Sequence, residues 1–125
     1  MEEREANQLS ATALAFVGDA VFTLYVRSKL AGRHDFKTGE LTRKAARIVS
    51  AVSQSKILAA IEGELSEAEL EIVKRCRNAH TNNAAKNATA AEYHRATGLE
   101  GLLGYLYLTG NDRLDELLKK CLENT

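Results

Sequence analysis

Two acidic residues interrupt the most apolar stretches of this 125-residue chain. Asp19 lies within Leu14–Val26, Glu100 lies within Gly98–Leu108, and neither has a basic residue three or four positions away. Desolvating an ionised carboxylate is costly unless a cation or hydrogen bonds compensate. Two isolated carboxylates of this kind could share a divalent cation, because Mg²⁺ takes oxygen ligands and retains several waters. Helix packing or ion pairing explains a single buried acid just as well.

Four glycines lie inside the two helices that are expected to carry these acids. An interior glycine costs a helix about 0.5 to 1 kcal/mol relative to alanine, and close approach of two helices can offset that cost. We therefore expect the two helices to cross near their glycines and to bring Asp19 and Glu100 together. The glycines are Gly18, Gly98, Gly101 and Gly104.

A basic stretch leading into an asparagine-rich loop is a second candidate site. Arginine offers a bidentate fork to phosphate, and asparagine can both donate and accept, so these residues could bind phosphate and ribose. Cations at the end of a helix also complement its dipole, which explains the cluster without a ligand. The residues are Arg75, Arg77, Asn78, Lys86 and Asn87. Another basic and polar group is typical of a solvated helix face: Arg43, Lys44, Arg47, Gln54 and Lys56.

The composition fits one compact domain, since a chain of this length can bury roughly two-thirds of its unfolded surface. No apolar run approaches the ~18 residues of a membrane-spanning helix, and the N-terminus lacks the apolar region of a signal peptide. We therefore expect a cytoplasmic protein with no membrane partner. The net charge is zero, yet basic residues concentrate in 27–56 and 72–98 and acidic residues in 57–71. Such segregation can build a basic face for a polyanion.

The hydrophobic pattern predicts an all-α fold, because proline is absent and apolar residues recur three and four positions apart. Helices are expected over about 10–30, 38–61 with a break near 43–46, 66–78 and 89–108, with a last helix after Asn111. Residues 78–87 are expected to form a loop. Capping boxes are predicted at Ser66 with Glu69 and at Thr89 with Glu92. The residues expected in the core include Leu14, Phe16, Val17, Val21, Phe22, Leu24, Tyr25 and Tyr107.

The motifs, taken in order, resemble the ribonuclease III family, and within it the short branch called Mini-ribonuclease III. The segment Leu14–Phe22, which contains Asp19, is similar to the signature helix of that family. Val49–Gln54, Arg75–Ala79 and Ala96–Leu108 then follow the pattern of the short branch. The resemblance covers about residues 9–122.

The resemblance implies an all-helical homodimer with one catalytic domain over residues 1–125 and no separate double-stranded-RNA-binding domain. It implies an endoribonuclease that hydrolyses phosphodiester bonds in double-stranded RNA with Mg²⁺, or with Mn²⁺ in its place. The precursor of large-subunit ribosomal RNA is the expected substrate. Asp19 and Glu100 take the catalytic and metal-binding roles of the family. The expected RNA contacts are Arg75, Arg77, Asn78, Lys86 and Asn87.

The chain departs from the full-length members of this family at two positions, where Ala15 and Thr97 replace acidic residues. Fewer anionic ligands therefore remain, and a non-catalytic RNA-binding module of the same fold is the alternative, which a cleavage assay separates. A helical protein-interaction domain with buried structural acids is a further alternative, and it would not bind duplex RNA.

Overall fold

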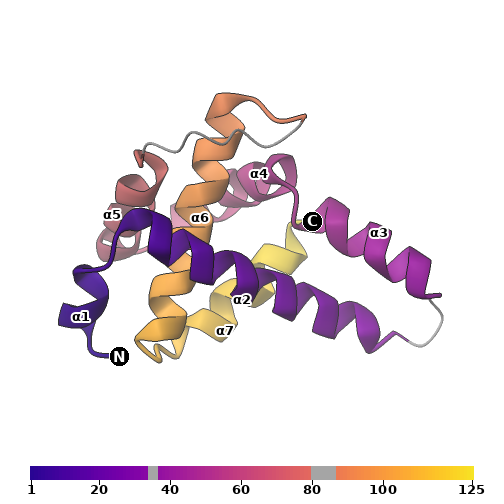
Figure 1. Cartoon of the computed structure of the whole chain (residues 1–125), viewed down its shortest axis with the longest axis horizontal. Helices are drawn as coiled ribbons and strands as arrows, with labels where there is room; N and C mark the ends of the chain where they lie inside the picture. Colours follow the sequence, from indigo (N-terminus) through magenta and orange to yellow (C-terminus); the bar gives the residue numbers. More distant parts are fainter. Residues whose placement is uncertain (34–36, 80–86) are drawn as a thin grey trace.

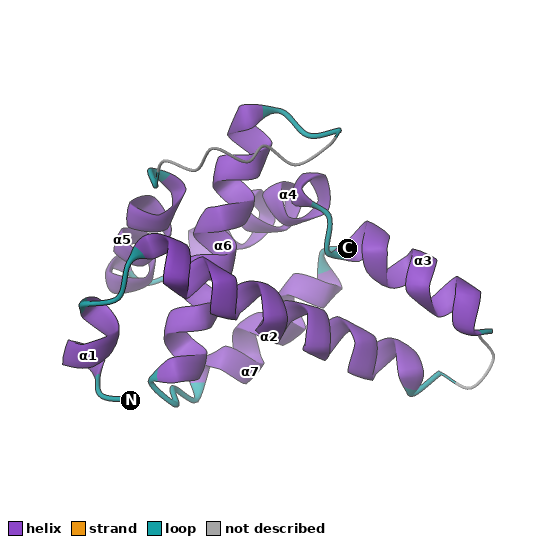
Figure 2. Ribbon diagram, in the orientation of Figure 1, coloured by secondary structure: helices purple, strands orange, loops and turns teal. Residues whose placement is uncertain are grey.

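The computed structural model describes residues 1–33, 37–79 and 87–125. This part of the chain forms α-helices and one short 3₁₀-helix, with no strand, which confirms the predicted all-α fold (Figure 1, Figure 2). No helix within the described ranges is both long and apolar enough to cross a membrane. The elements are α1 (Glu3–Asn7), α2 (Ala11–Ala31), α3 (Thr38–Ile48), α4 (Ala51–Ile61), η1 (Glu62–Glu64), α5 (Glu67–Arg77), α6 (Ala90–Leu108) and α7 (Arg113–Glu123).

Helix α6 is the central element of the fold. From Ala96 to Leu106 every residue is buried except Glu100, which is half-buried. A helix that is apolar around its whole circumference must be covered on all sides. Helices α2, α4 and α5 supply most of this cover, and α2 crosses in front of α6 in Figure 1. Glu100 is therefore the one acidic or basic side chain in the covered segment of α6.

The helix starts follow the capping signals in the sequence. The Ser10 hydroxyl accepts a hydrogen bond from the Ala13 N–H at 3.0 Å and so begins α2. The Asn111 side chain accepts from the Arg113 N–H at 2.9 Å, at the first residue of α7. Both predicted capping boxes are confirmed, at Ser66 with Glu69 and at Thr89 with Glu92.

Two predictions about the helices were wrong. Helix α3 runs through the expected break at 43–46, and the chain instead turns at Val49 and Ser50. The Ser50 hydroxyl accepts from the Ser53 N–H at 3.2 Å, and this cap restarts the chain as α4. Helix α1, which has only five residues, was not predicted.

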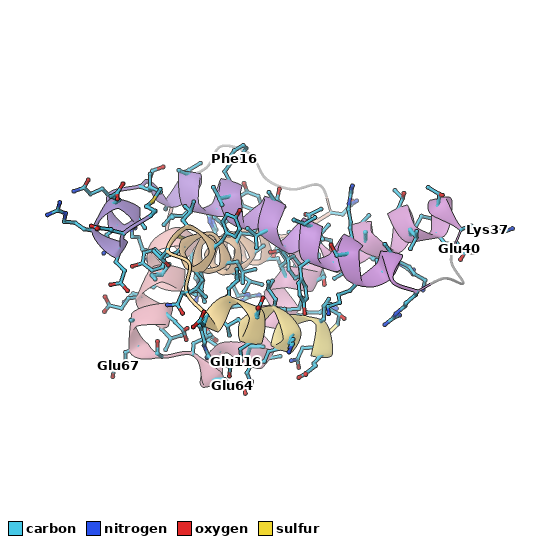
Figure 3. All side chains as sticks on the ribbon, turned by 90° about the horizontal axis from the view of Figure 1, so that it is seen from below. Phe16, Lys37, Glu40, Glu64, Glu67 and Glu116 are labelled. Carbon is cyan, nitrogen blue, oxygen red and sulfur yellow. The ribbon has the colours of Figure 1, made fainter. Side chains whose placement is uncertain are left out.

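Three large apolar side chains that were predicted to lie in the core are exposed to solvent. Phe16 is 80% exposed, Leu24 is 68% exposed and Tyr107 is 57% exposed. Figure 3 shows Phe16 at the edge of the molecule, pointing away from it. On α2 the predicted core residues Leu14 and Phe22 are buried, and so are Val26 and Leu30, which were not in the predicted stripe. The core-facing side of α2 is thus rotated from the predicted stripe.

The rest of the predicted stripe lines an open apolar groove, which we call the α2–α7 groove. It has a volume of about 410 Å³ and lies between α2, the end of α6 and the start of α7. Its walls come from the segment Val17–Ser28 of α2, from Tyr107, and from Leu114 and Leu118 of α7. The predicted apolar stripe therefore exists, but within one chain it faces a groove rather than a closed core.

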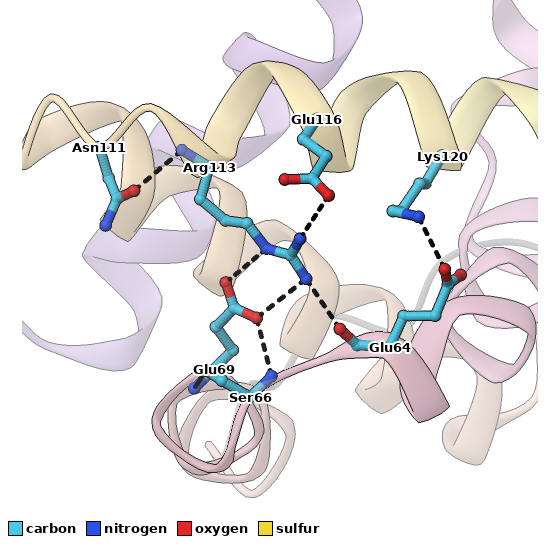
Figure 4. A network of polar contacts seen from close by, with 7 residues as sticks. All are labelled: Glu64, Ser66, Glu69, Asn111, Arg113, Glu116 and Lys120. Atoms are coloured by element: carbon cyan, nitrogen blue, oxygen red, sulfur yellow. Dashed lines mark hydrogen bonds and ion pairs between the residues drawn. The ribbon is translucent and has the colours of Figure 1, made fainter.

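A polar network holds α7 against η1 and the start of α5 (Figure 4). The Arg113 guanidinium donates to Glu69 at 3.0 Å and to the Glu64 carbonyl at 2.8 Å, and it pairs with Glu116 at 2.9 Å. Lys120 pairs with the Glu64 carboxylate at 2.7 Å. Helix α7, which forms one wall of the groove, is thereby fixed from its far side.

Candidate active site

The crossing of α2 and α6 is what brings Asp19 and Glu100 together. A Cβ atom built at Gly18 would lie 1.6 Å from the Glu100 carbonyl oxygen, and one at Gly104 would lie 2.0 Å from the Leu14 carbonyl oxygen. No side chain fits at either position, so the two backbones touch. The prediction that glycines permit this crossing is confirmed for Gly18 and Gly104.

The other two interior glycines serve a different contact. A Cβ atom at Gly98 would lie 3.0 Å from the Val73 carbonyl oxygen, and one at Gly101 would lie 2.2 Å from the Cys76 sulfur. Both neighbours belong to α5, so the expectation that these glycines face α2 was wrong. Instead they let α5 pack closely on α6.

Asp19 and Glu100 line one open pocket of about 330 Å³. Asp19 is exposed at the mouth, whereas Glu100 is half-buried. The remaining walls are Thr12, Ala15, Phe16, Tyr93 and Thr97. The pocket thus joins the two carboxylates that the sequence singled out, together with Ala15 and Thr97.

The environment of Glu100 opposes its negative charge. Burial, the charge of Asp19 and a hydrogen bond with Asp19 raise the pKa of the Glu100 carboxyl to about 8, although the hydrogen bond from Gln54 acts the other way. No lysine or arginine in the described ranges forms an ion pair with either acid. Within this part of the chain, neither acid is matched by a cation of its own.

The donor set fits a divalent cation that retains water. Two carboxylates facing one pocket, one of them buried and repelled by the other, are stabilised when a cation lies between them. No cluster of three or more acidic, histidine or cysteine side chains suited to a metal occurs among the described residues. The Thr97 hydroxyl donates to the Tyr93 carbonyl at 3.0 Å, which leaves its oxygen able to accept or coordinate. Water, Thr97 or substrate phosphate oxygens would have to complete the coordination shell.

Gln54 of α4 is a polar contact of Glu100 that the sequence analysis missed. Its side chain was predicted to be solvated, but it is only 2% exposed. Its amide nitrogen donates to the Val49 carbonyl at 2.9 Å and to Glu100 Oε2 at 3.3 Å. The amide oxygen has no partner, and a buried polar atom left unpaired costs about 1–3 kcal/mol. The only signal in the sequence was its place in the segment that resembles the short branch.

The predicted RNA-binding residues lie on and after the C-terminal end of α5. Arg77 and Asn78 are exposed and line a shallow pocket of about 520 Å³ together with Ala91 and His94 of α6. His94, to which the sequence gave no role, is thus a neighbour of the basic cluster. Arg77 and Asn78 also line a second pocket beside Lys74. These open pockets are accessible to a large anionic ligand.

The other members of this predicted set differ in their surroundings. The Arg75 guanidinium donates to the Leu9 carbonyl, so part of it is used to hold the start of α2. Asn87 is exposed and has a positive φ of 66°, a conformation that asparagine adopts more readily than most residues. Lys86 lies outside the described residues. The structure therefore brings only Arg77 and Asn78 together at one pocket.

The two cysteines are not candidates for nucleophilic chemistry. Burial raises the pKa of the Cys121 thiol to about 12, and it raises the pKa of the Cys76 thiol despite the nearby charge of Arg75. Cys76 packs under Gly101 in the contact between α5 and α6. Both thiols are core side chains.

Comparison with known proteins identifies similar chains over almost the whole length. A model of the ribonuclease III domain family matches residues 12–111. The chain is 42% identical to Mini-ribonuclease 3 of Enterococcus faecalis, covering 96% of this chain and 93% of that protein. It is 38% identical to Mini-ribonuclease 3 of Streptococcus pneumoniae, covering 95% of each. A crystallised protein of Fusobacterium nucleatum superposes with a TM-score of 0.82 at 28% identity, covering 93% of each chain.

Proposed function

The chain belongs to the ribonuclease III family and is an endoribonuclease of double-stranded RNA, and from this premise we propose that Asp19 and Glu100 form its metal-binding catalytic centre. The observation that carries the proposal is the meeting of two otherwise isolated carboxylates in one open pocket, at a helix crossing that only glycine permits. Mg²⁺ is the cation that this donor set favours, and Mn²⁺ can replace it.

The two carboxylates have different parts in this proposal. Asp19 is exposed at the mouth of the pocket, where it can bind a cation that arrives with its waters. Glu100 is more deeply placed, and because its pKa is raised to about 8, a cation nearby would favour its ionised form. When bound, the cation supplies activation of water for in-line attack and stabilisation of charge on the leaving 3′ oxygen. Together the two carboxylates would hold the cation so that it faces a phosphate in the open pocket.

We infer that the basic residues beyond α5 bind the RNA backbone. Arg77 and Asn78 present a guanidinium and an amide at one open pocket, and we extend this role to Arg75, Lys86 and Asn87. A-form RNA is recognised mainly through its phosphates, its 2′-hydroxyls and its shape. Binding should therefore weaken steeply as salt concentration rises. The substrate we propose is a structured RNA such as the large-subunit ribosomal RNA precursor, processed in the cytoplasm where it is made.

We propose that the enzyme acts as a homodimer, with a second copy of the chain covering the α2–α7 groove. The groove is lined mainly by apolar side chains, and Leu24 and Tyr107 at its walls are more than half exposed. It adjoins the acidic pocket, because Phe16 and Asp19 line the pocket while Val17 and Ala20 line the groove. A two-fold axis beside the groove would place two active sites near one another, one for each strand of a duplex.

The decisive experiment compares the wild type with Asp19→Asn and Glu100→Gln on long duplex RNA, with Mg²⁺ and with a chelator. We expect the wild type to cut only when metal is present and both variants to lose at least about a hundredfold in rate, because each loses a charged ligand. Glu67→Gln, an acid-to-amide change at an exposed position of α5, is the matched control and should cut normally.

The same assay separates the alternatives. Cutting by both variants at the wild-type rate would remove Asp19 and Glu100 from the chemistry. Duplex RNA binding without any cleavage by the wild type would support the non-catalytic module that Ala15 and Thr97 suggest. Retained RNA binding by Asp19→Asn, measured by gel shift, would show that the variant is folded and that the loss lies in catalysis.

A further inference from the structure

Gln54 is placed so that it contacts both the turn between α3 and α4 and the acidic pocket. It lies in the first turn of α4, and its side chain is almost completely buried. The amide nitrogen donates both of its hydrogens, one to the Val49 carbonyl at 2.9 Å and one to Glu100 Oε2 at 3.3 Å. A single side chain thus links the turn to the carboxylate.

The orientation of this amide is fixed by what surrounds it. Val49 is the residue directly after α3, and its carbonyl oxygen can only accept a hydrogen bond. If the amide were turned over, its oxygen would face the Val49 carbonyl oxygen, and that contact would become repulsive. The N–H that reaches Glu100 is therefore held in place by Val49.

The same orientation leaves the Gln54 amide oxygen buried and without a partner, the one such side-chain atom found in the described part of the chain. Protein interiors rarely leave a polar atom unpaired, and exceptions call for an explanation. An apolar side chain of similar size at this position would avoid the unpaired oxygen. What Gln54 provides in return is the hydrogen bond to Glu100.

We propose that Gln54 is a positioning residue that holds one oxygen of the Glu100 carboxylate and so presents the other to the metal. This inference rests on the proposed role of Glu100 as a metal ligand. Residues that orient a ligand commonly affect metal affinity by 10- to 100-fold when they are replaced. Gln54 is the one donor to the Glu100 carboxylate that is found among the described residues, so its hydrogen bond is what restrains the orientation of that carboxylate.

A matched control is available at the next position of α4. Ser55 is as buried as Gln54, and its hydroxyl accepts a hydrogen bond from Arg95 of α6 at 2.7 Å. Ser55→Ala therefore removes a buried hydrogen bond between the same two helices without touching Glu100. Any effect that comes only from loosening α4 against α6 should appear in both variants.

The test measures Mn²⁺ binding to the RNA-free protein by titration calorimetry, alongside thermal unfolding. Gln54→Met keeps the length of the side chain and removes the donor, and Gln54→Leu also removes the donor without adding a charge that could itself bind the metal. We expect both to bind Mn²⁺ about 10- to 100-fold more weakly than the wild type, at an unfolding temperature close to that of Ser55→Ala. In cleavage assays the Mg²⁺ concentration for half-maximal rate should rise, while KM for RNA stays unchanged.

Each outcome has a distinct meaning. Wild-type Mn²⁺ affinity in a folded Gln54→Met, with binding lost in Glu100→Gln, would overturn the positioning role alone. Equal weakening in Ser55→Ala would also overturn it, since general packing would then be sufficient. Wild-type Mn²⁺ affinity in Glu100→Gln would instead overturn the proposed metal site. If Gln54→Met does not fold, Gln54→Leu decides by the same comparison.

Discussion

At the scale of the residue, Glu100 shows a conflict between folding and catalysis. A carboxylate that is half-buried beside a second carboxylate is expensive to ionise, and its pKa rises to about 8 for that reason. The cost arises because Glu100 lies on the core helix α6 at the point where the exposed Asp19 approaches it. The ionised form of Glu100 destabilises the metal-free protein, and a bound cation would remove that destabilisation by compensating its charge.

This conflict predicts that Glu100→Gln stabilises the metal-free protein at high pH. The unfolded chain releases the Glu100 proton near the usual pKa of 4.5, whereas the folded chain keeps it until about pH 8. Folding therefore takes up a proton between these values, and stability falls as pH rises through that window. In chelator, at about pH 9, the variant should unfold several degrees above the wild type, and at about pH 4 the two should coincide. An equal offset at both pH values would contradict the assigned pKa.

Single residues differ in how well the sequence revealed them. Asp19 and Glu100 could be found because an acidic residue within an apolar stretch stands out whichever side of the helix is buried. Gln54 could not, because it lies among basic residues and α4 has only three turns. Which side of so short a helix is buried depends on the crossing with α6, which the local pattern does not contain.

At the scale of the element, the α2–α6 crossing depends on two glycines rather than on complementary side chains. Gly18→Ala should destabilise the protein by more than about 3 kcal/mol, because the new methyl group would overlap the Glu100 carbonyl and backbone cannot yield as a side chain does. Cleavage should fall as well, since the two acids separate when the helices do. Urea unfolding and the duplex RNA assay measure both effects.

The control for this prediction is Gly63→Ala in η1, where no atom lies within 4 Å of the added Cβ. It should change stability by less than about 1 kcal/mol. If Gly18→Ala were as mild as Gly63→Ala, the close crossing would be wrong.

The network around Arg113 gives a second prediction at this scale. Here stability falls as pH is lowered, whereas Glu100 lowers stability as pH rises. Burial alone would raise the pKa of Glu69, but hydrogen bonds from Ser66 and Arg113 outweigh it and hold the pKa below its usual value. The stability that ionised Glu69 gives the folded protein is therefore fully present above about pH 4.5, and it is lost as pH falls below that value. Glu69→Gln should cost about 1–2 kcal/mol at pH 7 and almost nothing near pH 3, as measured by urea unfolding. A cost that does not change with pH would show that the charge is irrelevant.

Helix boundaries were predictable where capping chemistry marked them and not elsewhere. Ser10, Ser66 and Thr89 each cap a helix that the sequence predicted. The turn at Val49 and Ser50 was missed because it interrupts an amphipathic pattern without glycine or proline. Ser50 was the available signal, but an isolated serine is common inside helices as well as before them.

At the scale of the whole molecule, α2 has two functional sides. One side carries Asp19 and packs its backbone on α6, and the other lines the α2–α7 groove. The sequence predicted an apolar stripe of the right composition but assigned it to the core of one chain. Periodicity shows that a stripe must be covered, and it does not say whether the cover comes from the same chain or from a second one.

The groove predicts the oligomeric state of the protein and what would change it. Leu24→Glu places a charge in the wall of the groove, at a side chain that is 68% exposed in the single chain and would be buried in the dimer. Light scattering at micromolar concentration should give a dimer mass for the wild type and a monomer mass for Leu24→Glu. The unfolding temperature of the variant should become independent of protein concentration, whereas that of the wild type should rise with it.

Ala59→Glu, which adds the same charge at an exposed position of α4 outside the groove, is the matched control and should remain dimeric. Because the proposed dimer places two acidic pockets against one duplex, Leu24→Glu should also cut RNA more slowly and nick one strand at a time. A monomeric wild type would contradict the groove as an interface and leave Asp19 and Glu100 to act in single chains. A dimeric Leu24→Glu would place the interface on another surface.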